Sequence, residues 1–180
     1  MARIPYPTPE QLPGKTRELL AKLPPINIFR MLAHADHVLE YFVRLGNRFL
    51  WKGSLDPVLR EIAILRVGYL SACEYETFQH ERIGRMLDMS DALIAAVRAG
   101  ADAEPLSALE RQVLRFVDDL VKNVRASDAT FTPMCEQLTV KQLQELTLVT
   151  GYYMMVCRFL STFDVDIERE TVTPAFTDNA

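Results

Sequence analysis

One segment of the sequence concentrates the residue types that acid–base or thiol chemistry needs. Cys73, Glu76 and His80 follow one another at spacings of three and four, so in a helix they share one face. Glu61 precedes them within a strongly apolar run. A carboxylate buried in such a run must pair with a cation or hold a proton more readily than in water, and the second property suits a general acid or base.

The residues before Cys73 indicate where its helix begins. Gly68, Ser71 and Ala72 are typical of a helix boundary. If Cys73 lies in the first turn of a new helix, the positive end of the helix dipole favours its thiolate. His80 would then exchange protons with Glu76, with Cys73, or through a water molecule with Glu61.

Each of these residues also has a purely structural interpretation. A buried cysteine is usually a small apolar side chain, and a histidine on an apolar face is often a satisfied core residue. Glu76 would then pair with a surface arginine, and Glu61 with Arg60 or Arg66. The sequence alone leaves these alternatives open.

Other side chains near the segment suggest binding roles. Arg66, Arg82 and Tyr69 are candidates for contacts with a substrate, the arginines with its carboxylate. Cys73, Glu76 and His80 are also suitable zinc ligands, with His34 or His37 as a fourth. Ligand type and spacing do not fix a tetrahedral geometry, so we predict neither a metal nor a cofactor. As residues that open a helix, His34 and His37 need no role beyond capping or exposure.

The elements that must position these residues are predicted to be helices. Apolar residues recur at steps of three and four, and we find no β-alternation and no hairpin turn. Ser107 with Glu110, and Thr139 with Gln142, are capping boxes that begin helices. We therefore expect an all-α fold of seven or eight helices, the last of which ends near residue 163 and is central and buried. The expected ranges are 14–23, 34–50, 58–70, 91–99, a helix from 107 and a helix from 139.

Composition limits the classes of function. The chain has 180 residues, of which 49% are hydrophobic, and a net charge of −4, which excludes a charge-driven grip on nucleic acid. Three cysteines without a disulfide spacing predict free thiols in a reducing, cytoplasmic setting. We expect no signal peptide and no membrane span. The expected organisation is a Pro-rich arm with a short helix (1–26), a helical domain (27–165) and a polar tail (166–180).

These residues carry a resemblance to a known family. The stretch REIAILRVGYLSACEYETFQH (60–80) resembles the carboxymuconolactone decarboxylase and alkylhydroperoxidase D superfamily, and GYYMMVCRFLSTFDV (151–165) is similar to its C-terminal helix. The likeness extends from about residue 27 to 165. It implies a compact all-α domain of the alkylhydroperoxidase D-like type, assembly into homo-oligomers from dimer to hexamer, and a site between the helix of Glu61 and the helix of Cys73 and His80.

The motif combines the features of two branches. In the peroxidase branch, as the resemblance implies, a Cys-x-x-Cys pair reduces peroxide while a glutamate and a histidine relay protons. Glu61, Cys73 and His80 match that pattern, but Glu76 stands in place of the second cysteine. Cys135 and Cys157 lie far away in the sequence and are not obvious substitutes. The decarboxylase branch instead has Glu-x-x-x-His, which Glu76 and His80 match.

Two enzymatic functions follow from this combination. The first is a cofactor-free lyase or isomerase that moves protons on a small carboxylated or lactone-like substrate, with Glu61 or Glu76 as base and His80 as acid or relay. The alternative is a thiol peroxidase that uses Cys73 with Glu61 and His80. A helical oligomer without enzymatic activity is a third reading. We expect the partners to be a small-molecule substrate and further copies of the chain, with no nucleic acid and no membrane.

Overall fold

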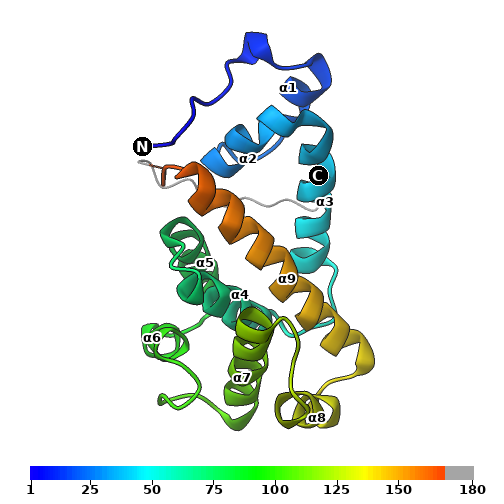
Figure 1. Ribbon diagram of the computed structural model, residues 1–180, viewed down its shortest axis with the longest axis vertical. Helices are drawn as coiled ribbons and strands as arrows, with labels where there is room; N and C mark the ends of the chain where they lie inside the picture. The colour runs from blue at the N-terminus through cyan, green and yellow to red at the C-terminus, as the bar shows by residue number, and fades with distance from the viewer. Residues whose placement is uncertain (169–180) are drawn as a thin grey trace. The chain divides into compact units, whose positions relative to one another are not determined.

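The computed structural model describes residues 1–168, and this part of the chain contains helices and no strands. The predicted all-α fold class is confirmed (Figure 1). Two 3₁₀ turns, η1 (Pro9–Gln11) and η2 (Ala33–Ala35), accompany the α-helices. The α-helices are α1 (Gly14–Leu20), α2 (Asn27–Leu32), α3 (Asp36–Trp51), α4 (Pro57–Leu70), α5 (Glu74–Met86), α6 (Asp91–Ala99), α7 (Ala108–Asn123), α8 (Asp128–Gln137) and α9 (Val140–Phe163).

Local capping explains why several helices begin where the sequence predicts. Asp56 accepts hydrogen bonds from the first backbone N–H groups of α4, and Pro57 occupies its first position. The Ser107 and Glu110 capping box begins α7, with both reciprocal hydrogen bonds present. Gln142 and Thr139 make the corresponding contacts at the start of α9. These starts are confirmed because caps depend only on neighbouring residues.

Three features differ from the sequence prediction. The sequence pattern predicts no separate helix in the region of α2, which has only six residues, or in that of α8, which contains Pro133. The expectation that the last helix is buried on all sides was wrong. Val140, Leu148 and Met155 of α9 are exposed. None of the described helices has the length and apolarity that crossing a membrane requires.

The chain divides into two compact units. One unit comprises Met1–Lys52 together with the chain from Leu160 onward, and the other comprises Gly53–Phe159. The predicted arm (1–26) belongs to the same unit as α2 and α3, and the predicted boundaries of a 27–165 domain stay a prediction. Most of the predicted polar tail (166–180) lies outside the described residues.

In the first unit, the N-terminal arm is hydrogen-bonded to the segment that follows α9. The backbone N–H of Arg3 donates to the carbonyl of Phe163 at 2.9 Å, and that of Ala2 donates to Asp166. The Asn27 side-chain amide donates to the Asp166 carbonyl at 2.8 Å. These bonds hold the extended, Pro-rich start of the chain, which cannot supply a full set of backbone donors of its own.

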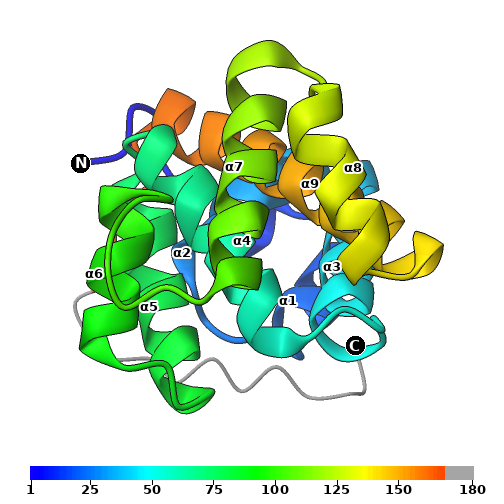
Figure 2. The same cartoon turned by 90° about the horizontal axis from the view of Figure 1, so that it is seen from below.

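The second unit is built around α4. Every residue of α4 from Leu59 to Gly68 is buried, including two arginines and a glutamate. This helix packs against α5, α6 and α7, and Figure 2 shows it behind α7 with α5 and α6 together to one side. A helix buried on all faces can carry charged side chains only where partners satisfy them. The charged residues of α4 therefore mark places to look for a site.

Candidate active site

Two helices joined by a tight turn position the candidate residues. Glu61 lies on α4, Glu76 and His80 lie on α5, and Cys73 is the residue that caps α5. The helices approach closely at Gly68, where a Cβ atom would meet Thr77 Cγ2 at 2.9 Å. A larger residue there would force α4 and α5 apart, so this glycine holds the two sets of side chains together.

The cluster consists of an imidazole held between two carboxylates. His80 Nδ1 lies 2.6 Å from Glu61 Oε2, and His80 Nε2 lies 3.1 Å from Glu76 Oε1. Glu61 Oε1 also accepts a hydrogen bond from Arg60 Nε at 3.1 Å. All four side chains are buried, with Glu61 fully enclosed. The cluster carries two negative and two positive charges when His80 is protonated, and is then formally neutral.

The surroundings of His80 favour its protonated form. Burial alone lowers the pKa of this imidazole, but the charges of Glu61 and Glu76, with their hydrogen bonds, outweigh burial and raise the pKa to about 10. The Glu76 Oε1 atom is buried and has no hydrogen-bond partner with adequate geometry, although it lies at ion-pair distance from His80. The cluster therefore holds a proton on the imidazole and an acceptor oxygen beside it.

Helix α9 closes the other side of the cluster. The Tyr153 ring packs edge-on against His80, with centroids 4.9 Å apart and an interplanar angle of 83°. Cys157, one turn further along α9, is buried, and its thiol is hydrogen-bonded to Cys73. That bond, burial and the charge of Glu76 all raise the pKa of Cys157. Burial and the Glu76 charge likewise raise the pKa of Tyr153.

One family profile matches part of the chain that contains the cluster. The profile of the carboxymuconolactone decarboxylase family matches residues 36–119, which contain Glu61, Cys73, Glu76 and His80. Over this segment the chain is similar to the carboxymuconolactone decarboxylase family, as the resemblance of its motif implies. No curated protein matches the chain.

Three solved structures share the fold of this chain. The alkylhydroperoxidase AhpD core of an uncharacterized peroxidase-related protein from Ralstonia eutropha JMP134 has a TM-score of 0.81 at 20% identity, covering 93% of both chains. An uncharacterized peroxidase-related protein from Silicibacter sp. TM1040 has a TM-score of 0.81 at 19% sequence identity, and the match covers 93% of this chain and 92% of that one. A putative antioxidant defence protein AhpD from Agrobacterium tumefaciens has a TM-score of 0.72 at 17% sequence identity, and the match covers 77% of this chain and 96% of that one.

The superfamily pattern identifies the cluster but not Cys157. The resemblance placed the site between the helix of Glu61 and that of Cys73 and His80, and in the structure Glu61 and Glu76 both lie beside His80. Sequence reasoning set Cys157 aside because it is distant in the chain. The one sequence signal for it was its position in the 151–165 segment, which is similar to the C-terminal helix of the superfamily.

The three predicted substrate-binding residues are engaged elsewhere. Arg66 donates to both oxygens of Asp118, at 2.6 and 2.9 Å, and to the backbone carbonyls of Val97 and Arg98. This set of bonds ties α4 to α6 and α7, and favours a structural role. The Tyr69 hydroxyl donates to Glu81, and burial with the Glu81 contact raises the pKa of Tyr69 to about 12. The guanidinium of Arg82 lies over the Phe78 ring, 5.7 Å from its centroid.

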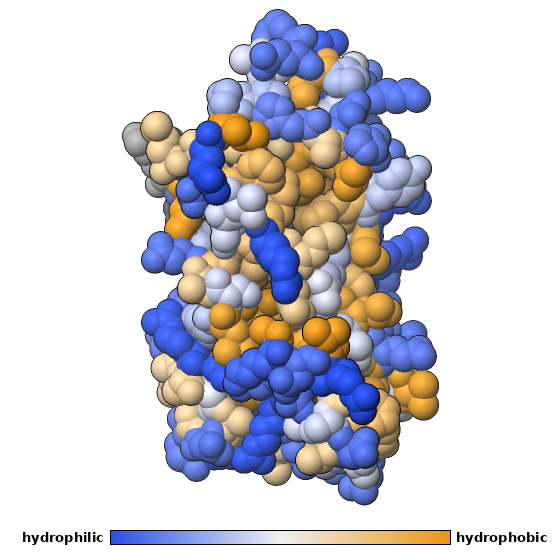
Figure 3. Space-filling view, viewed as in Figure 1, coloured by the Kyte–Doolittle hydropathy of each residue, from blue (hydrophilic) through white to orange (hydrophobic). Residues whose placement is uncertain are grey.

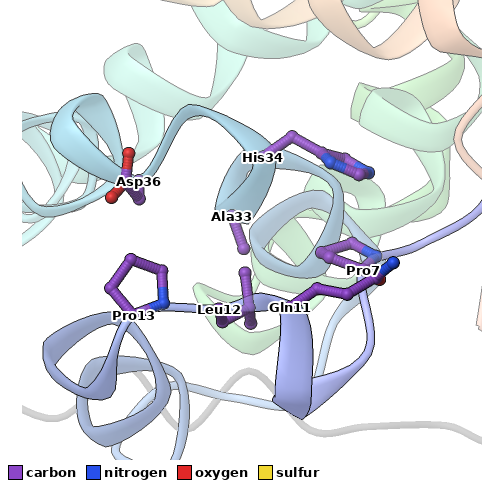
Figure 4. Close-up of a pocket in the computed structure, with 7 residues that line it drawn as sticks. All are labelled: Pro7, Gln11, Leu12, Pro13, Ala33, His34 and Asp36. Carbon is purple, nitrogen blue, oxygen red and sulfur yellow. The ribbon is translucent and has the colours of Figure 1, made fainter.

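His34 and His37 belong to the other compact unit. His34 Nε2 lies 2.9 Å from the carbonyl oxygen of Pro5, beside a pocket of about 380 Å³. Figure 4 shows the His34 ring toward Pro7 and the Asp36 side chain nearer Pro13. Within residues 1–168, no three His, Cys, Asp or Glu side chains are placed to hold a metal ion.

Proposed function

We propose that this chain is a thiol-dependent peroxidase that reduces hydroperoxides at Cys73. The observation that carries the proposal is the position of Cys73, which caps α5 at the buried cluster where Glu61 and Glu76 hold His80. A helix N-terminus favours a thiolate, and the neutral total charge of the cluster offsets the repulsion expected from Glu76. Sequence reasoning placed a lyase first. The thiols gathered at the cluster now favour the peroxidase.

The reaction uses the cluster as a proton carrier. The Cys73 thiol gives its proton to the buried carboxylate–imidazole chain, for which Glu76 Oε1 is an available acceptor. The sulfur then attacks one peroxide oxygen, so that an S–O bond forms and the O–O bond breaks. The chain returns a proton to the departing oxygen. Cys73 becomes a sulfenic acid, oxidised by two electrons, and the hydroperoxide becomes an alcohol.

The test is direct oxidation of the full chain. Hydrogen peroxide below millimolar concentration should oxidise Cys73, as detected by dimedone labelling and peptide mass spectrometry, and dithiothreitol should support turnover. Cys73→Ser should lose turnover, and Glu61→Gln and His80→Ala should slow it. Cys135→Ser is the matched control because Cys135 is a free, exposed cysteine on α8. If Cys73 is not oxidised under these conditions, the proposal fails.

A cofactor-free lyase is the second candidate function. It is favoured by the two carboxylates on opposite nitrogens of His80, because such a chain can take a proton at one end and deliver one at the other. A screen of small carboxylated lactones would detect it. Glu76→Gln and His80→Ala should then abolish turnover, whereas Cys73→Ser should retain most of it. Loss of lactone turnover in Cys73→Ser would count against this mechanism.

We also propose self-association in a reducing, cytoplasmic setting. The three cysteines are free thiols. Exposed apolar residues form a stripe on α3, and others lie on α9. Figure 3 shows apolar residues at the surface of the face it draws. The stripe on α3 comprises Val38, Tyr41 and Leu45, and the residues on α9 are Leu148 and Met155. Exposed apolar stripes of this kind are typical of protein interfaces. Light scattering at micromolar concentration should give a homo-oligomer, and a monomer would contradict the proposal.

A further inference from the structure

A second buried cysteine meets Cys73 at the candidate site. Cys157 and Cys73 are only 1% and 3% exposed, and the two thiols are hydrogen-bonded to each other. The side chain of Ser71, in the turn before Cys73, also contacts the Cys157 thiol. Cys157 is thus placed against the turn that presents Cys73, rather than elsewhere in the core.

An independent contact fixes the same face of α9 against α5. Tyr153 lies one turn before Cys157, and its ring packs edge-on against His80. On α5, Cys73 lies two turns before His80 and on the same face. The two helices therefore meet at two levels, with Tyr153 against His80 at one and Cys157 against Cys73 at the other. The charge of Glu76 raises the pKa of both Tyr153 and Cys157.

We propose that Cys73 and Cys157 form a reversible intramolecular disulfide, with Cys157 as the resolving thiol. Glu76 stands where the resemblance puts the second cysteine of the peroxidase motif, so a partner for Cys73 must come from another element. Cys157 is the cysteine that the structure brings to it. The pairing rests on the proposed function only for the identity of the oxidant, a hydroperoxide.

Disulfide formation needs only the two cysteines, and its reversal needs one external reductant. The Cys157 sulfur attacks the sulfenic sulfur of Cys73, so that the S–S bond forms and the S–O bond breaks. The hydroxyl leaves with the proton of Cys157 as water. The raised pKa of Cys157 disfavours its thiolate, so Cys73 makes the first attack on the peroxide, and the Cys157 sulfur becomes nucleophilic as its proton passes to the departing hydroxyl. A small-molecule or protein dithiol then reduces the disulfide by two thiol exchanges.

The test maps the disulfide in the full chain with and without peroxide. Diamide, which oxidises neighbouring thiols, and hydrogen peroxide are applied separately to Cys135→Ser protein, which removes the exposed cysteine. Non-reducing peptide mass spectrometry should find one Cys73–Cys157 linked peptide that has lost two hydrogens and is restored by dithiothreitol. Absence of this peptide after diamide overturns the inference, because hydrogen-bonded thiols should couple.

The diamide and hydrogen peroxide treatments test the disulfide and the proposed function separately. If diamide forms the disulfide while peroxide leaves Cys73 unmodified, the pairing stands and the peroxidase proposal falls. Cys157→Ser should trap the peroxide-treated protein at the sulfenic acid of Cys73, which dimedone labels and which wild type does not accumulate. Cys157→Ala serves the same purpose if the serine variant does not fold. Equal dimedone labelling of wild type and a folded Cys157 variant would overturn the resolving role.

Discussion

The chain places a histidine beside a carboxylate in two very different settings. In the second unit, His80 Nδ1 lies 2.6 Å from Glu61, and their side chains are 7% and 0% exposed. In the first unit, His37 Nδ1 lies 3.6 Å from Asp36, and their side chains are 81% and 43% exposed. Both pairs join an imidazole to a carboxylate, so the difference in exposure comes from the elements that carry them.

That difference decides how much chemistry each pair can support. Water screens the surface pair, and exposed ion pairs typically contribute about 0–1 kcal/mol. Water does not screen the buried pair. Glu76 supplies a second carboxylate beside His80, and the Arg60 guanidinium pairs with Glu61. A proton can therefore be held at a defined atom only in the buried cluster. Its neighbours are fixed by packing, which favours a reaction centre there rather than at His37.

The largest expected effect is on stability when Glu61 loses its charge. Glu61→Gln leaves Arg60 and His80 without their shared partner in the interior, and breaking a buried pair costs about 3–5 kcal/mol. Urea unfolding followed by circular dichroism at pH 7 would measure the free energy of unfolding. If Glu61→Gln lowered the free energy of unfolding by less than about 1 kcal/mol, which is the range of surface ion pairs, the buried and the exposed pair would not differ in their contribution to stability.

The second effect is a loss of stability at high pH that depends on His80. Its pKa is about 10 in the folded chain, raised from 6.5, so its contribution is complete below pH 6.5 and is lost as the pH rises toward 10. The slope should reach about 1.4 kcal/mol per pH unit. Urea unfolding at several pH values in this window would show it. His80→Asn should flatten the profile, whereas the exposed His37→Asn should keep the wild-type slope.

A smaller effect is expected for Glu76→Gln. Glu76 Oε1 makes no hydrogen bond, so the substitution removes a charge from the cluster and costs about 1–2 kcal/mol. It also removes one of the two charges that raise the pKa of His80, so the loss of stability, which still begins near pH 6.5, should be complete at a lower pH and be smaller in total than in wild type. The same titration measures both quantities. An unchanged pH profile would show that Glu61 alone controls His80.

The smallest effect belongs to the surface pair. Asp36→Asn should change the free energy of unfolding by less than about 1 kcal/mol, because the ion pair is exposed. The asparagine oxygen can still accept the backbone N–H of His37, as Asp36 does at 2.9 Å. Thermal or urea unfolding beside Glu61→Gln gives the comparison directly. A larger cost than that of Glu61→Gln would reverse our ranking of the two settings.

Some parts of the fold and site could be predicted because they depend on local spacing. Asp56 with Pro57, and Ser107 with Glu110, begin helices through contacts within a few residues. The spacing of Cys73, Glu76 and His80 likewise fixes one helix face once α5 forms. Six-residue α2 and Pro-containing α8 lacked such signals. Their helical state is instead settled by packing against the rest of the chain.

By itself, the sequence determined the helical class, the main helix starts and the face that presents Cys73, Glu76 and His80. Only the tertiary structure decided what this face meets. It placed Glu61 against His80 and Cys157 against Cys73. It also engaged the Arg66 guanidinium with Asp118 and with backbone carbonyls at the end of α6. The spacing of apolar residues in the sequence shows on which face of its own helix a side chain lies. Which helix lies opposite depends on how all the apolar faces are buried together.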